Sequence, residues 1–235
     1  MKGLTDILYT FDKNRTADWG SELWIKSDDA CRSIIVADWF KDIAFEVLNR
    51  GYINIDNKFG IEPLAVELYY SEEDKGGYRD PIMYHINKRR PIVFEDNGIN
   101  FEYFKFGSLH LHTSGVDVTF ENPFKHYRAS FLIREFSVFK IEEDGSHTTI
   151  LKKCVNSTFI YDYMFPFGVN SETMDSIYWE RFDKPKSNKP PRRFHRKGVK
   201  QYIKVDGKYQ FDSKNMKYKD NGIQCEKPWK FIREQ

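Results

Sequence analysis

His110 and His112 lie two residues apart in the sequence LHLH. Successive side chains of a β-strand point to opposite faces, so this spacing places both imidazoles on one face and both leucines on the other. Such a pair can stack on a nucleobase, donate to a phosphate, or bind a metal with Asp117 or His85 as third ligand. A base pocket, a metal site and ordinary half-exposed histidines all remain open; no metal or cofactor is assigned.

A glutamate lies inside an apolar run, where Glu67 is flanked by Val66 and Leu68. If Val66 and Leu68 face the core, strand alternation puts Glu67 on the opposite face together with Ala65 and Tyr69. A carboxylate among buried neighbours is costly unless it is paired or functional, whereas exposure on the far face is harmless. Glu67 is therefore either a general base or a surface or structural glutamate.

Two further charged residues interrupt β-rich runs. Asp117 follows Ser114 and Gly115, which favour a turn or a bulge, and its carboxylate can orient a polar neighbour or act as an alternative base. Arg134 alternates with apolar residues in the run FLIREF, so its guanidinium projects from the face opposite Ile133. There it either pairs with a carboxylate of an adjacent strand or contacts a phosphate or a base.

Basic residues are concentrated towards the C-terminus. The net charge of the chain is only +2, yet residues 181–235 hold 17 lysines and arginines against 6 acidic residues. The segment 184–200 (KPKSNKPPRRFHRKGVK) has eight basic residues, no acidic one and interleaved aromatic rings. This composition suits phosphate contacts with bases stacked on the rings, and the alternative is a solvated, proline-containing loop. The residues expected to contact nucleic acid are Lys189, Arg192, Arg193, His195, Arg196 and Lys197.

Well-marked motifs of other protein classes do not occur. The sequence has no Walker loop, GxGxxG, HExxH or GxSxG, which argues against the best-marked nucleotide-binding proteins, zinc proteases and serine hydrolases. Cys31, Cys154 and Cys225 show no disulfide or zinc spacing, so a reducing, cytoplasmic compartment is expected. No stretch approaches ~18 uncharged apolar residues, so neither a signal peptide nor a membrane partner is expected.

The elements that must position these residues follow from the periodicity of the sequence. Apolar residues at helical spacing between 27 and 53 predict one or two helices that end near Arg50, before Gly51. Turn residues at 96–98, 143–145 and 205–208 predict hairpins. We therefore expect one α+β domain over residues 1–235, with a mostly antiparallel sheet and flanking N-terminal helices. Its β-rich runs span residues 61–70, 90–104, 107–121, 129–141 and 148–153.

Four of these patterns resemble, in the same order, the alkyladenine (3-methyladenine) DNA glycosylase family. They are AVELYYSEED (65–74), GSLHLHTSGVDVTFEN (107–122), RASFLIREFSV (128–138) and KPPRRFHRKG (189–198). The resemblance covers about residues 38–205 at low identity. It implies the fold of that family and a monomeric, cofactor-free enzyme that flips a damaged purine out of double-stranded DNA and hydrolyses its glycosidic bond.

The resemblance also implies roles for individual residues. Glu67 would be the general base that activates water. Tyr78 and His85 are both candidates for the family's pocket histidine, while the family's two strand tyrosines appear here as histidines. A noncatalytic nucleic-acid-binding domain of similar fold is the alternative to this enzyme. The substrate pocket would be formed by Tyr69, His85, His110, His112, Asp117 and Arg134.

Overall fold

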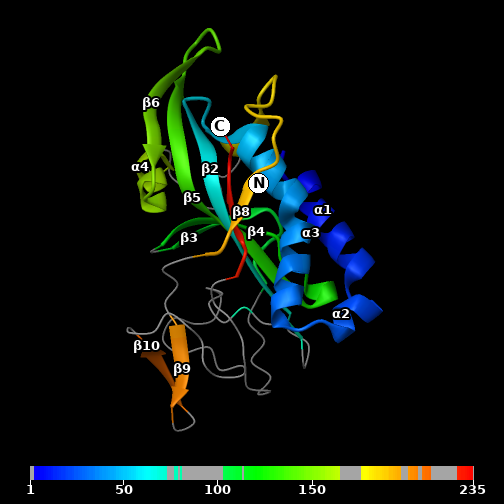
Figure 1. Ribbon diagram of the computed structural model, residues 1–235. Coiled ribbons are helices and arrows are strands. Elements are labelled where there is room, and N and C mark those ends of the chain that lie inside the picture. The colour runs from blue at the N-terminus through cyan, green and yellow to red at the C-terminus, as the bar shows by residue number, and fades with distance from the viewer. Residues whose placement is uncertain are drawn as a thin grey trace.

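A curled antiparallel sheet with helices on one face forms the framework of the protein (Figure 1). The computed structural model describes residues 3–72, 77–78, 80, 103–112, 114–164, 176–196 and 227–234, and the backbone of 201–205 and 208–212. Within these residues nine strands belong to one sheet, and two further strands form a separate hairpin. The predicted α+β class is confirmed.

The strands of the large sheet come from segments spread between Gly51 and Ile232. They are β1 (Gly51–Ile55), β2 (Phe59–Glu72), β3 (Ser108–His112), β4 (Gly115–Thr119), β5 (Tyr127–Ile141), β6 (His147–Cys154), β7 (Ile177–Arg181), β8 (Arg192–Phe194) and β11 (Lys230–Ile232). The separate hairpin consists of β9 (Gln201–Val205) and β10 (Lys208–Asp212). Short helical turns are η1 (Pro123–Lys125), η2 (Ser157–Ile160) and α4 (Tyr161–Met164).

The two long strands β2 and β5 pair with each other from end to end and carry the remaining strands on their outer edges. The outer edge of β5 pairs with β4 at one end and with β6 at the other, and β3 completes that side by pairing with β4. The outer edge of β2 pairs with β1 and then with β11, while β7 extends β1 and β8 extends β11. Each of these pairings is antiparallel.

Three helices precede the sheet: α1 (Thr5–Asp18), α2 (Glu22–Lys26) and α3 (Asp29–Asn49). The first turn of α3 is capped by the Asp28 carboxylate, which accepts a hydrogen bond from the Cys31 amide at 2.7 Å. The helix stops just before Arg50 and Gly51, as the sequence predicts. No helix in the described part of the chain is long and apolar enough to cross a membrane.

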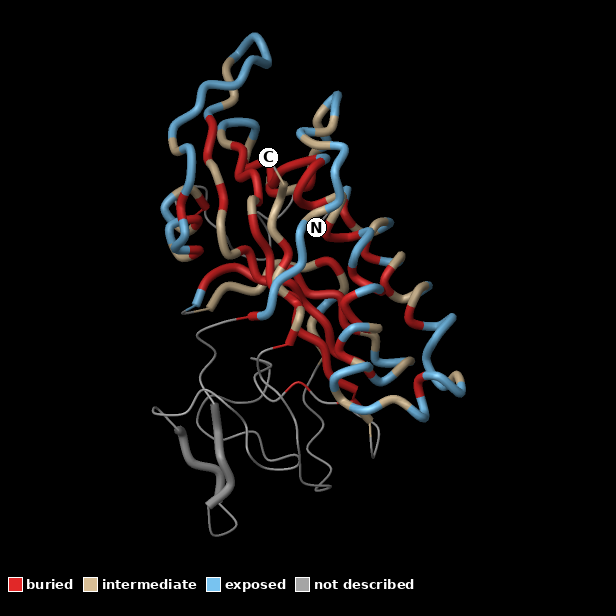
Figure 2. Tube along the Cα trace, in the orientation of Figure 1, coloured by how far each residue is buried: buried red, intermediate tan, exposed pale blue. Residues whose placement is uncertain are grey.

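The main core lies between α3 and the sheet. Apolar side chains recur along α3 at helical spacing, among them the fully buried Val36, Phe40 and Ile43, and they pack with Val66 and Leu68 of β2. Figure 2 shows this buried layer between the helices and the strands, with exposed residues on the outer side of α1 and α2 and at the tip of the β5–β6 hairpin. Glu67 and Tyr69 alternate with core residues along β2 and therefore lie on its opposite face.

The end of the chain is tied to the start of α3 by buried polar contacts. Lys227 Nζ donates to Asp29 at 3.0 Å and to the Tyr78 hydroxyl at 2.6 Å, and Trp229 Nε1 donates to the Ser33 carbonyl at 2.7 Å. Burial lowers the pKa of Lys227, and the nearby Asp29 carboxylate opposes that shift. These contacts fix β11 beside β2.

Most of the elements predicted from periodicity are present. The helix ending near Arg50, the turn at 143–145 between β5 and β6, and the hairpin around 205–208 are confirmed. The predicted turn at 96–98 and most of the β-rich run 90–104 lie outside the described residues. Helices α1 and α2 occupy the N-terminal segment, where periodicity predicts no particular element.

Gly60 offers a test of the close contact between β2 and β5. A Cβ at this position would overlap the ring of Phe139, its cross-strand partner. We expect Gly60→Ala to lower the free energy of unfolding by about 1–3 kcal/mol, because the ring must leave its position. Urea unfolding measures the change. In a Phe139→Leu background, Gly60→Ala should lower the free energy of unfolding by less. An equal decrease in both backgrounds would show that overlap with the Phe139 ring is not the cause.

Candidate functional site

One row of cross-strand partners runs across six strands on the face of the sheet opposite the core. Partners in an antiparallel ladder point to the same face, so the side chains of this row lie side by side. The row begins at the exposed edge strand β8 and ends at β3. Its members, in order, are Phe194, Lys230, Glu67, Leu132, Asp117 and His110.

An arginine of β5 lies on the face of this row, next to a bulge between β2 and β5. The register shifts between Ala65 and Val66, which pair with Glu135 and Ile133, so Arg134 takes no place in the ladder. A bulged residue is turned relative to its neighbours. The guanidinium of Arg134 donates to Glu67 Oε2 at 2.6 Å through Nε and contacts the Tyr69 hydroxyl at 3.2 Å through Nη2.

Glu67 is 3% exposed and is held at one oxygen. The Tyr69 hydroxyl donates to Glu67 Oε2 at 3.2 Å, so both hydrogen bonds to the carboxylate fall on the same oxygen. No described residue donates a hydrogen bond to Glu67 Oε1. Burial, and then the charge of Glu67, raises the pKa of Tyr69, so the phenol remains a hydrogen-bond donor.

His110, His112 and Asp117 form a second polar group on the same face. The ring of His112 is hydrogen-bonded through Nε2 to Asp117 Oδ2, and the amide of Ser114 donates to its Nδ1 at 3.2 Å. This pattern assigns the proton of a neutral His112 to Nε2. Asp117 is fully buried, and one ligand atom from each of the three residues lies within 4.8 Å of the others.

Aromatic side chains hold this second group in place. The ring of His110 stacks on that of His112 at a centroid distance of 5.4 Å and contacts the tilted ring of Phe104 at 4.5 Å. The Tyr161 hydroxyl accepts from the His112 amide at 2.8 Å and lies 2.5 Å from the carbonyl oxygens of His112 and Gly115. Tyr161 thereby closes the β3–β4 turn. Phe104 and Tyr161 are not among the residues predicted from the sequence, although both lie in aromatic-rich segments.

Arg196 has a different place from the one expected for a phosphate contact. It is fully buried and donates to both oxygens of Asp80, at 2.9 and 3.0 Å, and to the Leu68 carbonyl at 3.1 Å. Its guanidinium also lies over the rings of Tyr69 and Trp229. Arg196 therefore supports the strand that carries Glu67 and is not presented to a ligand at the surface.

The other basic residues of the segment lie at the surface where they are described. Lys189, Arg192, Arg193 and His195 are exposed, whereas Lys197 and the pocket candidate His85 lie outside the described residues. Arg192 lies over the half-exposed ring of Phe194 at 5.2 Å, and Arg193 pairs with Asp38 at 2.9 Å. An exposed aromatic and basic edge thus flanks the row that contains Glu67.

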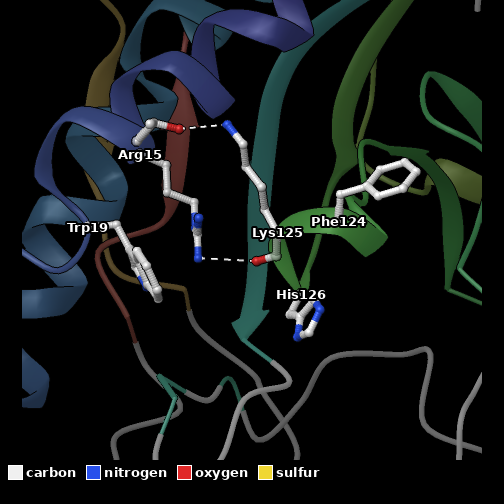
Figure 3. A pocket seen from close by; sticks show the side chains of 6 residues that line it. Arg15, Trp19, Phe124, Lys125 and His126 are labelled. Atoms are coloured by element: carbon white, nitrogen blue, oxygen red, sulfur yellow. Dashed lines mark hydrogen bonds between the residues drawn. The ribbon is translucent and has the colours of Figure 1, made fainter.

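A separate hollow of about 350 Å³ opens between α1 and η1. It is lined by Arg15, Trp19, Phe124, Lys125 and His126, which Figure 3 shows around the opening. The Arg15 guanidinium faces the Lys125 carbonyl at 3.5 Å and donates to the Tyr70 hydroxyl at 2.7 Å, so the cations of this hollow are engaged with the protein. None of its lining residues belongs to the row.

Comparison of the chain with protein-family models, with curated proteins and with solved structures finds no significant match. The site must therefore be interpreted from its own geometry.

The Arg196–Asp80 pair is buried and the Arg193–Asp38 pair is exposed. Comparing them tests how much the buried pair contributes to stability. Asp80→Asn leaves Arg196 buried with a neutral partner, and we expect the free energy of unfolding to fall by about 3–5 kcal/mol. Asp38→Asn, which removes the exposed partner of Arg193, should cost less than about 1 kcal/mol. Urea unfolding of both variants measures the difference, and equal effects would show that burial of the Arg196–Asp80 pair does not matter for stability.

Proposed function

We propose that this chain is a DNA glycosylase that hydrolyses the N-glycosidic bond of an alkylated or deaminated purine, with Glu67 as the general base. The observation that carries the proposal is the arrangement of Glu67: Oε2 is held by Arg134 and Tyr69, while no described residue donates to Oε1. The resemblance of the sequence to 3-methyladenine DNA glycosylases supports the same role. On this proposal the sheet and α3 share the fold of that family.

The proposed reaction needs a carboxylate that is fixed in direction but still able to take a proton. Oε1 of Glu67 takes a proton from water, the water oxygen forms a bond to the sugar carbon C1′, and the bond between C1′ and the base nitrogen breaks with its electron pair leaving on the base. Arg134 offsets the charge that burial would otherwise make costly. Tyr69 and Arg134 together hold the carboxylate in one orientation.

Two imidazole rings on the sheet face of Glu67 suit recognition of a flipped base. His110 and His112 lie on β3, three strands from Glu67, where the two rings stack on each other and His110 also contacts the ring of Phe104. Flipped bases are commonly read by stacking and by hydrogen bonds from fixed donors. Leu132, which lies in the row between Glu67 and Asp117, provides an apolar surface between these two polar groups.

The exposed edge at β8 suits the nucleic-acid backbone. Phe194 is separated from Glu67 by only one strand, β11, so their backbones are roughly 10 Å apart at the usual strand spacing. Lys189, Arg192 and Arg193 are exposed near this edge. Basic groups of this kind position duplex DNA through its phosphates. The proposed partner is therefore double-stranded DNA, bound by a single copy of the chain.

A noncatalytic nucleic-acid-binding domain is the second candidate. The observation that favours it is the ion pair of the buried Glu67 with the partly exposed Arg134, because such a pair also occurs as a purely structural contact. The two candidates share the basic edge and differ in whether Glu67 is needed for bond cleavage.

Replacement of Glu67 separates the two candidates. In Glu67→Gln we expect the release of hypoxanthine or 3-methyladenine from duplex DNA to fall by about 10²-fold or more, with DNA affinity retained. Strand cleavage after alkali measures release. Glu62→Gln, at another arginine-paired glutamate of β2, is the matched control and should retain release. Salt-sensitive DNA binding without release by the wild type would favour the noncatalytic domain.

The basic edge is tested by the salt dependence of DNA binding. Arg192→Ala combined with Arg193→Ala should weaken binding and reduce the slope of log K against log salt by roughly 0.9 for each phosphate that the variant no longer neutralises. Lys152→Ala combined with Lys153→Ala removes two exposed cations from β6, away from this edge, and should leave the slope unchanged. Equal slopes for the wild type and the arginine variant would exclude β8 from the DNA interface.

A further inference from the structure

We propose that His110, His112 and Asp117 form a binding site for one divalent first-row transition metal ion of the Zn²⁺ type. The sequence alone assigned no metal here, because it showed no clear third ligand and left Asp117 and His85 as candidates. This inference does not rest on the glycosylase proposal, since it concerns only the ligand atoms of the β3–β4 hairpin.

The hairpin brings the three side chains to one face. His110 and His112 alternate along β3, and Asp117 of β4 is the direct cross-strand partner of His110. Their ligand atoms lie within 4.8 Å of one another. Zinc–ligand bonds of 2.0–2.2 Å place neighbouring ligands roughly 3.3 Å apart, so small side-chain rotations are enough to close the site.

The hydrogen bond between His112 and Asp117 marks the place of the ion. His112 Nε2 and Asp117 Oδ2 are already in direct contact, with a proton between them. For a metal ion to bind at Nε2, this proton would have to move to Nδ1 by exchange with solvent, so that the imidazole stays neutral and no net proton is lost. The Ser114 amide now directed at Nδ1 belongs to an exposed residue, so it can turn to solvent.

The surroundings give the site the rigidity that a metal centre requires. Tyr161 fixes the backbone at His112 and Gly115, and the Ser157 hydroxyl accepts a hydrogen bond from the Val116 amide at 3.1 Å. Gly115 lies against Ser157, where a larger residue would not fit. These contacts hold the β3–β4 turn from outside the ligand set and so act as supporting interactions for the ligands.

The ligand types select the class of ion. Two imidazoles and one carboxylate suit Zn²⁺, Co²⁺ or Fe²⁺, whereas Mg²⁺ and Ca²⁺ prefer oxygen ligands alone. Three protein ligands leave at least one position for water, as in catalytic rather than structural zinc sites. The positive ion would also offset the charge of the Asp117 carboxylate, which is fully buried.

Titration of the chelator-stripped protein with Co²⁺ tests this site, because the visible absorption bands of bound Co²⁺ report its ligands. We expect one equivalent to bind, Zn²⁺ to displace it and Mg²⁺ to leave the bands unchanged. His112→Ala and His110→Ala should each weaken binding by about 100-fold or more, since loss of a supporting residue alone costs 10–100-fold. His195→Ala, at an exposed histidine of the β8 edge, is the matched control and should bind as the wild type does.

His110 is only half-buried, so His110→Ala is expected to fold even if changes at the buried Asp117 disturb the hairpin; circular dichroism of each variant checks this. Absence of Co²⁺ bands in the wild type, or equal binding by folded His110→Ala and the wild type, would overturn the proposal. The titration contains no nucleic acid. Failure of metal binding is therefore distinguishable from failure of base release, which is measured separately at Glu67.

Discussion

The carboxylate of Glu67 lies in the interior, and its charge must be compensated there. Arg134 of β5 meets this requirement: strand alternation places it on the same face as Leu132, and its guanidinium reaches Oε2 at 2.6 Å. The register of β2 and β5 shifts beside this residue, so Arg134 has no partner in the ladder. Compensation of the buried anion thus depends on the pairing of the two longest strands, whereas the two histidines and Asp117 lie on β3 and β4 at the side of β5.

Other buried charges, outside the site, anchor β2 and the end of the chain. Arg196 binds Asp80 and the carbonyl of Leu68, next to Glu67 in the chain, and Lys227 joins the end of the chain to α3. Such pairs are costly to assemble but more costly to leave half-formed, so they favour one arrangement of the segments that they join. Their partners are far apart in the sequence, which makes β8 and β11 depend on contacts formed only in the complete fold.

Strand alternation was enough to predict which faces the key residues occupy, but not which residues meet. Glu67 and Tyr69 do lie opposite Val66 and Leu68, and the two histidines do share a face. The alignment of Glu67 with Asp117 across β5 depends on the pairing register, which short-range patterns do not encode. Arg196 illustrates the other limit: in sequence it is one of eight cations in a basic run, and only the distant Asp80 distinguishes it as a buried residue.

Tyr69 connects the two polar groups electrostatically. Its pKa is raised chiefly by burial and then by Glu67, and Asp117 contributes in the same direction, so both carboxylates act on one phenol. A divalent ion at Asp117 would oppose that contribution and so ease the loss of the phenol proton, whereas Glu67 would continue to disfavour it. The phenol donates a hydrogen bond to Glu67 Oε2. A metal ion at the histidine site would therefore alter the hydrogen bond that the proposed base accepts, without direct contact between the ion and Glu67. Tyr69 is therefore the phenol on which the charges of both groups act.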